Sequence, residues 1–275
     1  MTRLRVLLGA TLLGLAAAGG AWALRQRPVE VPVAREERDV PVRVFGLGTI
    51  EAQVSSRIGF EVAGTLAEVL ADHGDRVPAG TVLAKHTLTA PFDAQVIARL
   101  REPGTALGPG EAVFSLVAPG SLWALAYVDE GRAGAIREGL PAEVRLRSLP
   151  GEVFPGRVVR IGLESDRVTE ERRVHVRCER CPPQPILGEQ VQVEVETGRL
   201  PAARLVPEAA VEGFDGSSGR VWVIEDGRLR QREVRFAART LDARLALDPA
   251  LPADLPVATR VLASFREGRA ARPAP

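Results

Sequence analysis

The stretch from Val62 to Leu116 repeats itself, and this repeat restricts the fold more than any other feature of the 275-residue sequence. A shift of 30 positions places Gly74 on Gly104 and Gly80 on Gly110. The same shift superimposes apolar positions, namely Val62 on Phe92, Leu66 on Val96, Leu70 on Leu100, Val77 on Leu107 and Leu83 on Val113. An internal repeat defines the structural unit of a chain, so it is interpreted before other features.

Each copy has the pattern strand, glycine turn, short strand, second glycine turn and strand. Because glycine tolerates the positive φ that many turns need, Gly74, Gly80, Gly104 and Gly110 are predicted to be the turns that define the fold. One copy cannot bury its apolar face alone, whereas two copies that face each other can. The sequence therefore predicts a two-sheet β-sandwich with pseudo-twofold symmetry.

Two motifs in this stretch carry a family resemblance, Gly74–Ala84 (GDRVPAGTVLA) and Thr89–Val96 (TAPFDAQV). They resemble the lipoyl- and biotinyl-carrier fold in the split form of periplasmic adaptor proteins, the membrane fusion protein family of efflux and secretion pumps. That family reads Gly-Asp-x-Val-x-x-Gly-x-x-Leu and Ala-Pro-Phe-Asp-Gly-x-Val, so Ala94 replaces a glycine. The resemblance covers the chain from about Val40 to Leu262, in the domain order of the family.

The connection between the two halves departs from the family pattern. Most members insert a long α-helical hairpin there, which reaches toward an outer-membrane channel. Here only Lys85-His86-Thr87-Leu88 joins the halves, and the sequence has no heptad pattern. The resemblance therefore implies an adaptor variant without the hairpin. An outer-membrane channel stays open as a partner, but the chain has no hairpin to reach it.

Lys85 lies where true carrier domains attach lipoate or biotin to a lysine. Its neighbours Ala84 and His86 differ from the Met-Lys-Met or Asp-Lys-Ala context of modified lysines. An exported chain would also not meet the cytoplasmic ligase. We interpret Lys85 and His86 as solvated turn residues and expect no cofactor and no metal, since no further ligands are visible near His86.

The N-terminus predicts a membrane anchor. Arg3 and Arg5 precede an uncharged apolar run, Val6–Leu24. Its 19 residues are close to the roughly 20 that a bilayer-spanning helix needs, and the positive flank orients the N-terminus toward the cytoplasm. Ala21-Trp22-Ala23 also fits a cleaved secretory signal. We favour an uncleaved anchor over residues 1–25; both interpretations place the remaining chain on the periplasmic side of the inner membrane.

Short strands alternate with turns from Leu122 onward. Asp129 and Gly139 are predicted to cap one short helix over Glu130–Glu138. The predicted strands are Leu122–Val128, Pro141–Leu146, Gly156–Ile161, Arg172–Cys178 and Gln190–Glu196. This pattern favours a small closed β-barrel. The segments that resemble the adaptor barrel are Leu122-Trp123, Val128-Asp129-Glu130, Phe154–Val158, Glu164–Arg172 and Leu187–Val191.

The last part of the chain predicts a further β unit. Leu205–Val211 resembles the Val-Pro-x-x-Ala-Val strand of the family, and a hairpin is predicted to turn at Glu225-Asp226-Gly227. Leu251–Val257 lies where the family has two glycines, and it contains neither. The mainly β organisation is then a signal anchor or transmembrane helix at 1–25, an extended linker at 26–39, a membrane-proximal β domain made of 40–50 and 200–265, a lipoyl-like (barrel-sandwich hybrid) domain at 51–120, a β-barrel domain at 121–199 and a disordered tail at 266–275.

Cys178 and Cys181 are the only cysteines, and three interpretations are open. A redox motif expects a helix after the cysteines, but three of the next four residues are prolines. A zinc site needs two more ligands, and only His175 is near in sequence. We favour a local disulfide, which an oxidising compartment permits, over two free thiols.

No catalytic constellation is visible, and the net charge of +1 does not favour a nucleic-acid partner. The resemblance implies a non-enzymatic periplasmic adaptor that couples an inner-membrane transporter, of the RND or ABC class, to the periplasmic path and assembles into a homo-oligomeric ring. The alternative is an envelope scaffold or binding protein without a pump. A carrier domain that uses Lys85 is a remote third hypothesis.

Overall fold

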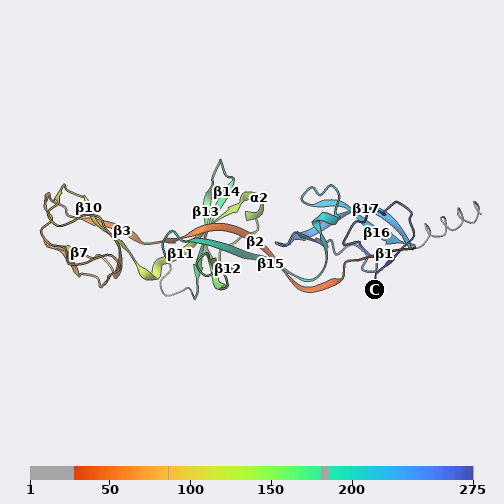
Figure 1. The fold of residues 1–275 in the computed structure, drawn as a ribbon, viewed down its shortest axis with the longest axis horizontal. Coiled ribbons are helices and arrows are strands. Elements are labelled where there is room, and N and C mark those ends of the chain that lie inside the picture. Colours follow the sequence, from red (N-terminus) through yellow and green to blue (C-terminus); the bar gives the residue numbers. More distant parts are fainter. Residues whose placement is uncertain (1–27, 86, 181–185, 275) are drawn as a thin grey trace, which may run out of the picture. The chain divides into compact units, whose positions relative to one another are not determined.

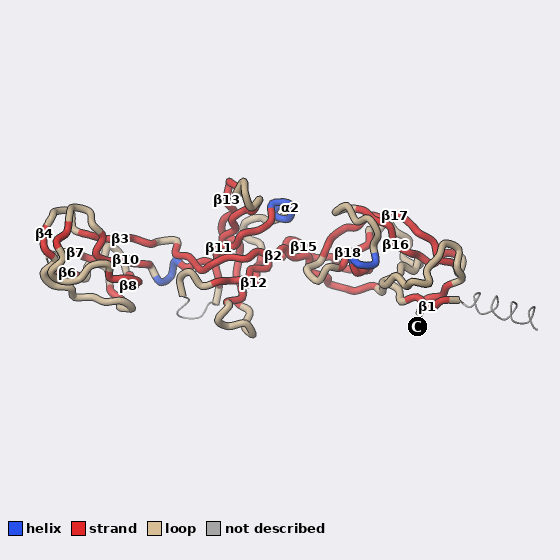
Figure 2. The backbone as a smooth tube through the Cα atoms, turned by 45° about the horizontal axis from the view of Figure 1, so that its top comes forward, coloured by secondary structure: helices blue, strands red, loops and turns tan. Residues whose placement is uncertain are grey.

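The computed structural model describes residues 28–85, 87–180 and 186–274, and most of them lie in strands (Figures 1 and 2). Within these ranges the helices are short: α2 (Glu130–Ala133) and two 3-10 turns, Pro119–Ser121 and Glu208–Ala210. The mainly β prediction is thus confirmed. No helix in the described part of the chain has the length and apolar character needed to cross a bilayer. The predicted anchor at residues 1–25 lies outside that part.

The chain forms two compact units. One contains Met1–Arg43 and Gly198–Pro275, and the other contains Val44–Thr197. Two long strands, β2 (Glu36–Ala52) and β15 (Gln190–Pro207), each run from one unit into the other. Each unit is described by itself below.

The repeated stretch folds into small sheets that surround one core. The strands are β3 (Ser55–Gly59), β4 (Gly64–Thr65), β5 (Arg76–Val77), β6 (Val82–Ala84), β7 (Leu88–Thr89), β8 (Ala94–Arg99), β9 (Ala106–Leu107) and β10 (Ala112–Val117). One sheet has the order β3-β10-β8-β5, and β4–β9 and β6–β7 form two further pairs. Both copies supply the core, which includes Leu66, Leu83, Val96 and Val113.

Pairs of main-chain hydrogen bonds obey the 30-residue shift. In each pair an amide of one copy donates to the other copy, and the related amide donates in return. These bonds are Gly74 to Val96 and Gly104 to Leu66 (2.9 and 2.7 Å), Gly80 to Ala90 and Gly110 to Phe60 (both 2.8 Å), and Val96 to Asp75 and Leu66 to Thr105 (both 2.9 Å). The β5–β8 and β4–β9 pairings are related by the same shift. Neither copy can therefore complete its hydrogen bonding without the other.

The four repeat glycines have the backbone conformation that their residue type permits. Gly74 and Gly104 have φ of 94° and 88°, and Gly80 and Gly110 have φ of 80° and 77°. A side chain at these positions would be strained, because L-residues rarely adopt a positive φ. The repeat in sequence is therefore a repeat in backbone geometry.

A closed barrel of six strands follows. Its strands are β11 (Leu122–Asp129), β12 (Pro141–Leu146), β13 (Phe154–Ser165), β14 (Glu171–Cys178) and parts of β2 and β15. The order β12-β13-β14-β11-β2-β15 closes because β15 also pairs with β12. Valines at alternate positions fill the interior, as in β15, where Val191, Val193 and Val195 are buried and Gln190 and Gln192 are exposed.

Close strand approach inside the barrel depends on Gly48 of β2. A Cβ atom at this position would lie 1.7 Å from the main-chain oxygen of Leu125 in β11. Any side chain would therefore separate the two strands, which pair from Leu47 opposite Tyr127 to Ala52 opposite Leu122.

Two predictions for the barrel region differ from the structure. The helix expected over Glu130–Glu138 ends at Ala133, and Asp129 makes no side-chain capping bond. Residues 40–50 were expected in the membrane-proximal domain, yet Val44 and Ile50 lie in the barrel core. The physical reason is that β2 is long enough to serve both units, which a short predicted strand did not suggest.

The other unit contains a sheet with the order β15-β18-β17-β16. Its strands are β16 (Ser218–Glu225), β17 (Arg228–Arg239) and β18 (Arg244–Leu247). The hairpin between β16 and β17 turns at Asp226 and Gly227, both with positive φ (50° and 68°), as the sequence predicts. Val206, Val221, Val223 and Leu245 are buried in its core.

The ends of the described chain differ from the predicted linker and disordered tail. Val29–Val31 forms β1 and pairs in parallel with β19 (Ala271–Pro273). Val31 is fully buried and Ala271 is 3% exposed, both in a core with Trp222 and Phe265. The polar, proline-rich composition of both segments did not indicate these two short strands, which are distant in sequence and pair with each other.

Candidate interaction surfaces

The described residues near the predicted sites form no cluster of metal-ligating side chains. In the described ranges, no three His, Cys, Asp or Glu side chains are grouped so that they could hold a metal ion. Cys178, the last residue of β14, is disulfide-bonded. Cys181, the only other cysteine in the sequence, lies outside the described residues, so the pairing of the two stays a prediction.

Lys85 lies at the short connection between the two copies. Its ammonium group forms an exposed ion pair with Glu68. The flanking strands β6 and β7 pair with Ala84 opposite Leu88, and Thr87 has a φ of 74°. The two halves are thus joined by a tight turn, and His86 within it lies outside the described residues.

Apolar side chains cover part of the outer wall of the barrel, on β2 and β11. Alternation places Val44, Ile50, Ala124, Ala126 and Val128 in the barrel core, and the intervening residues face outward. These outward residues are Phe45, Leu47, Trp123, Leu125 and Tyr127, which we call the β2–β11 patch. Leu47 is 57% exposed, whereas Leu125 is covered by its neighbours.

Trp123 and His175 form a half-buried pair at the edge of the β2–β11 patch. Their ring centroids are 4.4 Å apart. Among the described residues, the buried indole nitrogen of Trp123 and Nδ1 of His175 have no hydrogen-bond partner. Burial, and next the nearby Arg160 guanidinium, lower the pKa of His175 below its ordinary value of 6.5. This environment therefore favours the neutral imidazole over the charged form.

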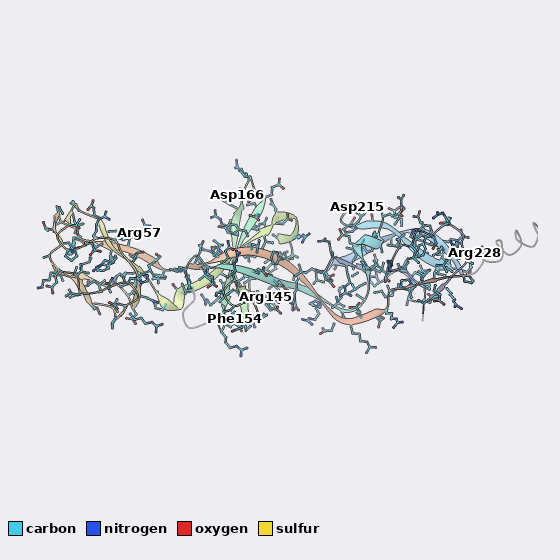
Figure 3. All side chains as sticks on the ribbon, viewed as in Figure 1. Arg57, Arg145, Phe154, Asp166, Asp215 and Arg228 are labelled. Carbon is cyan, nitrogen blue, oxygen red and sulfur yellow. The ribbon has the colours of Figure 1, made fainter. Side chains whose placement is uncertain are left out.

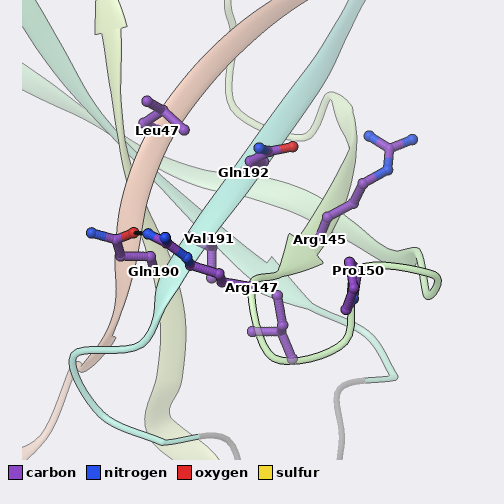
Figure 4. Close-up of a pocket in the computed structure, with 8 residues that line it drawn as sticks. Leu47, Arg145, Arg147, Pro150, Gln190, Val191 and Gln192 are labelled. Carbon is purple, nitrogen blue, oxygen red and sulfur yellow. Dashed lines mark hydrogen bonds between the residues drawn. The ribbon is translucent and has the colours of Figure 1, made fainter.

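A hollow of about 340 Å³ lies beside the patch, where β2, β15 and β12 meet (Figure 4). It is lined by Leu47, Arg145, Leu146, Arg147, Pro150, Gln190, Val191 and Gln192. Arg145 forms ion pairs with Glu194 (2.5 Å) and Glu143 (3.0 Å). The guanidinium of Arg147 donates to the side-chain oxygen of Gln190 (Figure 4). The hollow is therefore a small apolar floor with an arginine rim.

The end of β13, the start of β14 and the turn between them, together residues 162–171, form a projecting tip that we call the β13–β14 tip. The Asp166 carboxylate accepts bonds from the amides of Val168 (2.8 Å) and Thr169 (3.1 Å). These two bonds lower the pKa of Asp166. Leu163 and Val168 are almost completely exposed although the tip itself is ordered by hydrogen bonds.

These surfaces suit binding to another protein, because large exposed apolar side chains on ordered elements mark interaction sites. Sequence analysis missed the β2–β11 patch and the hollow. The signal was present in β2 and β11, where apolar residues occupy both faces of each strand instead of alternating with polar ones.

Residues 121–183 match the family described as the CusB-like β-barrel domain. Over 83 residues the chain is 39% identical to a UPF0194 membrane protein encoded in the asrC 5′ region of Acidithiobacillus ferridurans. The matched stretch covers 28% of this chain and only 25% of that relative.

Three solved structures have a similar fold. MacA from Actinobacillus actinomycetemcomitans superimposes with a TM-score of 0.67 at 11% identity, covering 82% of this chain and 98% of that one. A MacA chimera containing the α-hairpin domain of Pseudomonas aeruginosa MexA gives 0.62 at 12% identity, covering 79% and 96%. ZneB from Cupriavidus metallidurans gives 0.52 at 15% identity, covering 88% and 95%. At these identities the likeness concerns the fold.

Proposed function

We propose that this chain, whose resemblance to the periplasmic adaptor or membrane fusion protein family is confirmed, is a non-enzymatic adaptor subunit of an inner-membrane efflux or transport complex. The observation that carries the proposal is the match of residues 121–183 to the CusB-like β-barrel domain family. The likeness in fold to MacA, which extends over 82% of the chain, supports it.

In this proposal the chain acts by binding a transporter and other copies of itself. The barrel and the unit that contains β16–β18 pack on the periplasmic face of a transporter of the RND or ABC class, and several copies surround the substrate path as a ring. Residues 1–25 anchor each copy in the inner membrane, in agreement with the name of the relative as a membrane protein. The exposed β2–β11 patch and β13–β14 tip supply surfaces of the kind that such an assembly needs.

Co-purification tests the proposal. The tagged full-length chain is expressed at native level, membranes are solubilised in mild detergent, and bound proteins are identified by mass spectrometry, with untagged membranes as the control. We expect an inner-membrane transporter in stoichiometric amount. Deleting the gene for this chain and deleting the gene for that transporter should then cause the same loss of export. Recovery of envelope proteins without a transporter would contradict the proposal.

The alternative is an envelope scaffold without a pump. The tight turn at Lys85 favours it, since the described residues contain no helical hairpin that could reach an outer-membrane channel. The same two deletions separate the hypotheses, because a scaffold predicts an envelope defect that no transporter deletion reproduces.

A further inference from the structure

We propose that the β13–β14 tip of one copy inserts into the hollow beside Arg147 on the barrel of a second copy, so that copies associate head to tail. This inference rests on the proposed adaptor function, because it assigns the surfaces through which adaptor copies would assemble.

The tip has the form of an interface anchor. Leu163 and Val168 are 104% and 91% exposed, more than any other large apolar side chains in the described chain. Exposing two such side chains on one turn is unfavourable in water unless a partner covers them. The turn is held by main-chain bonds from Asp166 to Glu171 and from Glu170 to Asp166, both 2.9 Å. An ordered turn binds with a smaller loss of conformational entropy than a disordered one.

The hollow offers a complementary surface. Leu146 and Val191 form a buried apolar floor, and the exposed Leu47 and Pro150 form its sides. Its volume of about 340 Å³ is at the lower end of the range for small-molecule pockets. A hollow of this size suits one or two aliphatic side chains.

The charges of the two surfaces are also complementary. Residues 162–171 contain four carboxylates and one arginine. Among the described residues, Glu164 and Glu170 of the tip form no ion pair, and neither does Arg147 at the rim of the hollow. Arg147 hydrogen-bonds only to the neutral Gln190. An arginine without a carboxylate partner beside an apolar floor therefore favours an acidic, apolar-tipped partner such as this turn.

The tip and the hollow lie on different sides of the same barrel. The β13–β14 hairpin and the loop after β12 project in opposite directions (Figures 1 and 2). Asp166 of the tip and Arg145 at the hollow are likewise on opposite sides of the barrel (Figure 3). One copy therefore cannot fill its own hollow. Contact between two different surfaces of identical chains is heterologous, and such contacts repeat from copy to copy to give rings or filaments.

Cysteine cross-linking tests the geometry with the full-length chain in detergent. L163C and Q192C copies are prepared separately, with the native cysteines unchanged, and are mixed at micromolar concentration under oxidising conditions. We expect a cross-linked dimer in the mixture and in neither copy alone, and a ladder of multimers from the L163C/Q192C double variant. A dimer from L163C alone would indicate tip-to-tip contact and would overturn the proposal, as would the absence of any cross-link.

Sedimentation of the uncross-linked chain tests the energetics. L163S/V168S and R147E should each weaken self-association at least about tenfold, as expected for removal of an interface anchor. E164R should weaken it as well, and E164R combined with R147E should restore part of the loss. The matched control is V62S, because Val62 is 71% exposed but belongs to the sandwich.

Failure of this inference is distinguishable from failure of the proposed function. If L163S/V168S self-associates normally but loses the co-purified transporter, the tip binds the transporter, the inference is wrong and the adaptor function stands. If no transporter co-purifies while cross-linking and sedimentation give the expected results, the adaptor proposal is wrong and the head-to-tail contact stands. Unchanged melting temperatures of the variants show that they fold, since both tip residues lie outside every core.

Discussion

The Arg204 side chain fixes the loop at residues 251–255. Its guanidinium donates to the main-chain oxygens of Leu251 (3.0 Å), Pro252 (2.9 Å), Ala253 (3.2 Å) and Leu255 (2.8 Å). The family pattern has two glycines in this region, and this chain has none. The planar fork of arginine instead satisfies carbonyl groups that turn inward, which lysine cannot do with the same geometry.

We predict that R204A destabilises the unit that contains β16–β18 by about 2 kcal/mol, because it leaves four carbonyls without their charged donor. R204K should cost less, because an ammonium group keeps the charge but cannot reach all four oxygens. Urea unfolding gives the free energy, and hydrogen exchange of residues 251–255 locates the effect. The control is R235A. The Arg235 side chain is 80% exposed and its contact with Asp248 spans 3.8 Å, so its removal should change stability by less than about 0.5 kcal/mol. Equal effects of R204A and R235A would contradict the prediction.

We expect the stability of the barrel to depend on pH through the protonation of His175. Because burial lowers its pKa in the folded state, the unfolded chain binds more protons between that lowered pKa and 6.5. Stability from this group is therefore complete above pH 6.5 and is lost as pH falls through the folded pKa. The lowered pKa values of Asp166 and Asp215 change the free energy of unfolding only at a pH near or below their ordinary pKa of 3.8.

We predict that the urea midpoint of the barrel falls between pH 7 and pH 5 in the native chain and falls less in H175Q, which cannot become charged. Tryptophan fluorescence follows the transition, since Trp123 lies against this ring. The control is H73Q, because His73 is an exposed residue of the sandwich. Parallel pH profiles for the native chain and H175Q would refute the assignment.

At the scale of elements, the two halves of the sandwich are complete without their connection. Their hydrogen bonds run between copies in pairs related by 30 residues, and the β6–β7 turn adds only one strand pair. We predict that a helical hairpin inserted between Lys85 and His86 leaves the sandwich folded, because both ends of the insertion leave from adjacent positions of one turn. The cost of a longer loop grows only slowly with its length.

Circular dichroism and the melting temperature measure the outcome of the insertion. The inserted chain should gain helix signal and melt within a few degrees of the native chain. A matched insertion inside β8, after Val96, should unfold the sandwich because it interrupts the β8–β10 pairing between Val96, opposite Leu116, and Ala98, opposite Ser115. If the insertion at Lys85 is as damaging as the one in β8, the sandwich does depend on its short connection and the prediction is disproved.

At the scale of the whole molecule, the start and the end of the described chain stabilise each other. β1 and β19 pair over three residues, and Ala271 is buried against the core that contains Val31. We predict that A271D destabilises this unit by more than about 2 kcal/mol, because a carboxylate would be buried without a partner. R272A, one position further on, should cost less than about 1 kcal/mol, since its ion pair with Glu30 is exposed.

Urea unfolding with hydrogen exchange at Val29–Val31 measures the effect. Faster exchange of these amides in A271D but not in R272A is the expected result. Equal exchange in both variants would mean that the C-terminal segment does not stabilise β1, as the sequence-based prediction of a disordered tail implies.

The sequence by itself determined the features that are local or repeated. The glycines of the sandwich, the alternation in β12, β14 and β15, and the turn at Asp226-Gly227 each record a backbone requirement of the segment that contains them. The 30-residue repeat records even a long-range arrangement, because a pair of matching halves has one simple way to bury both apolar faces.

Only the tertiary structure decided what depends on partners distant in the chain. β1 and β19 are strands because they meet, Val44 belongs to the barrel because β2 continues between units, and Asp129 does not cap its helix. The β2–β11 patch and the hollow exist because barrel closure sets which face of β2 points outward. Residue type and spacing report local preference, whereas burial on the outer or inner face is settled only by the strands that pack on either side.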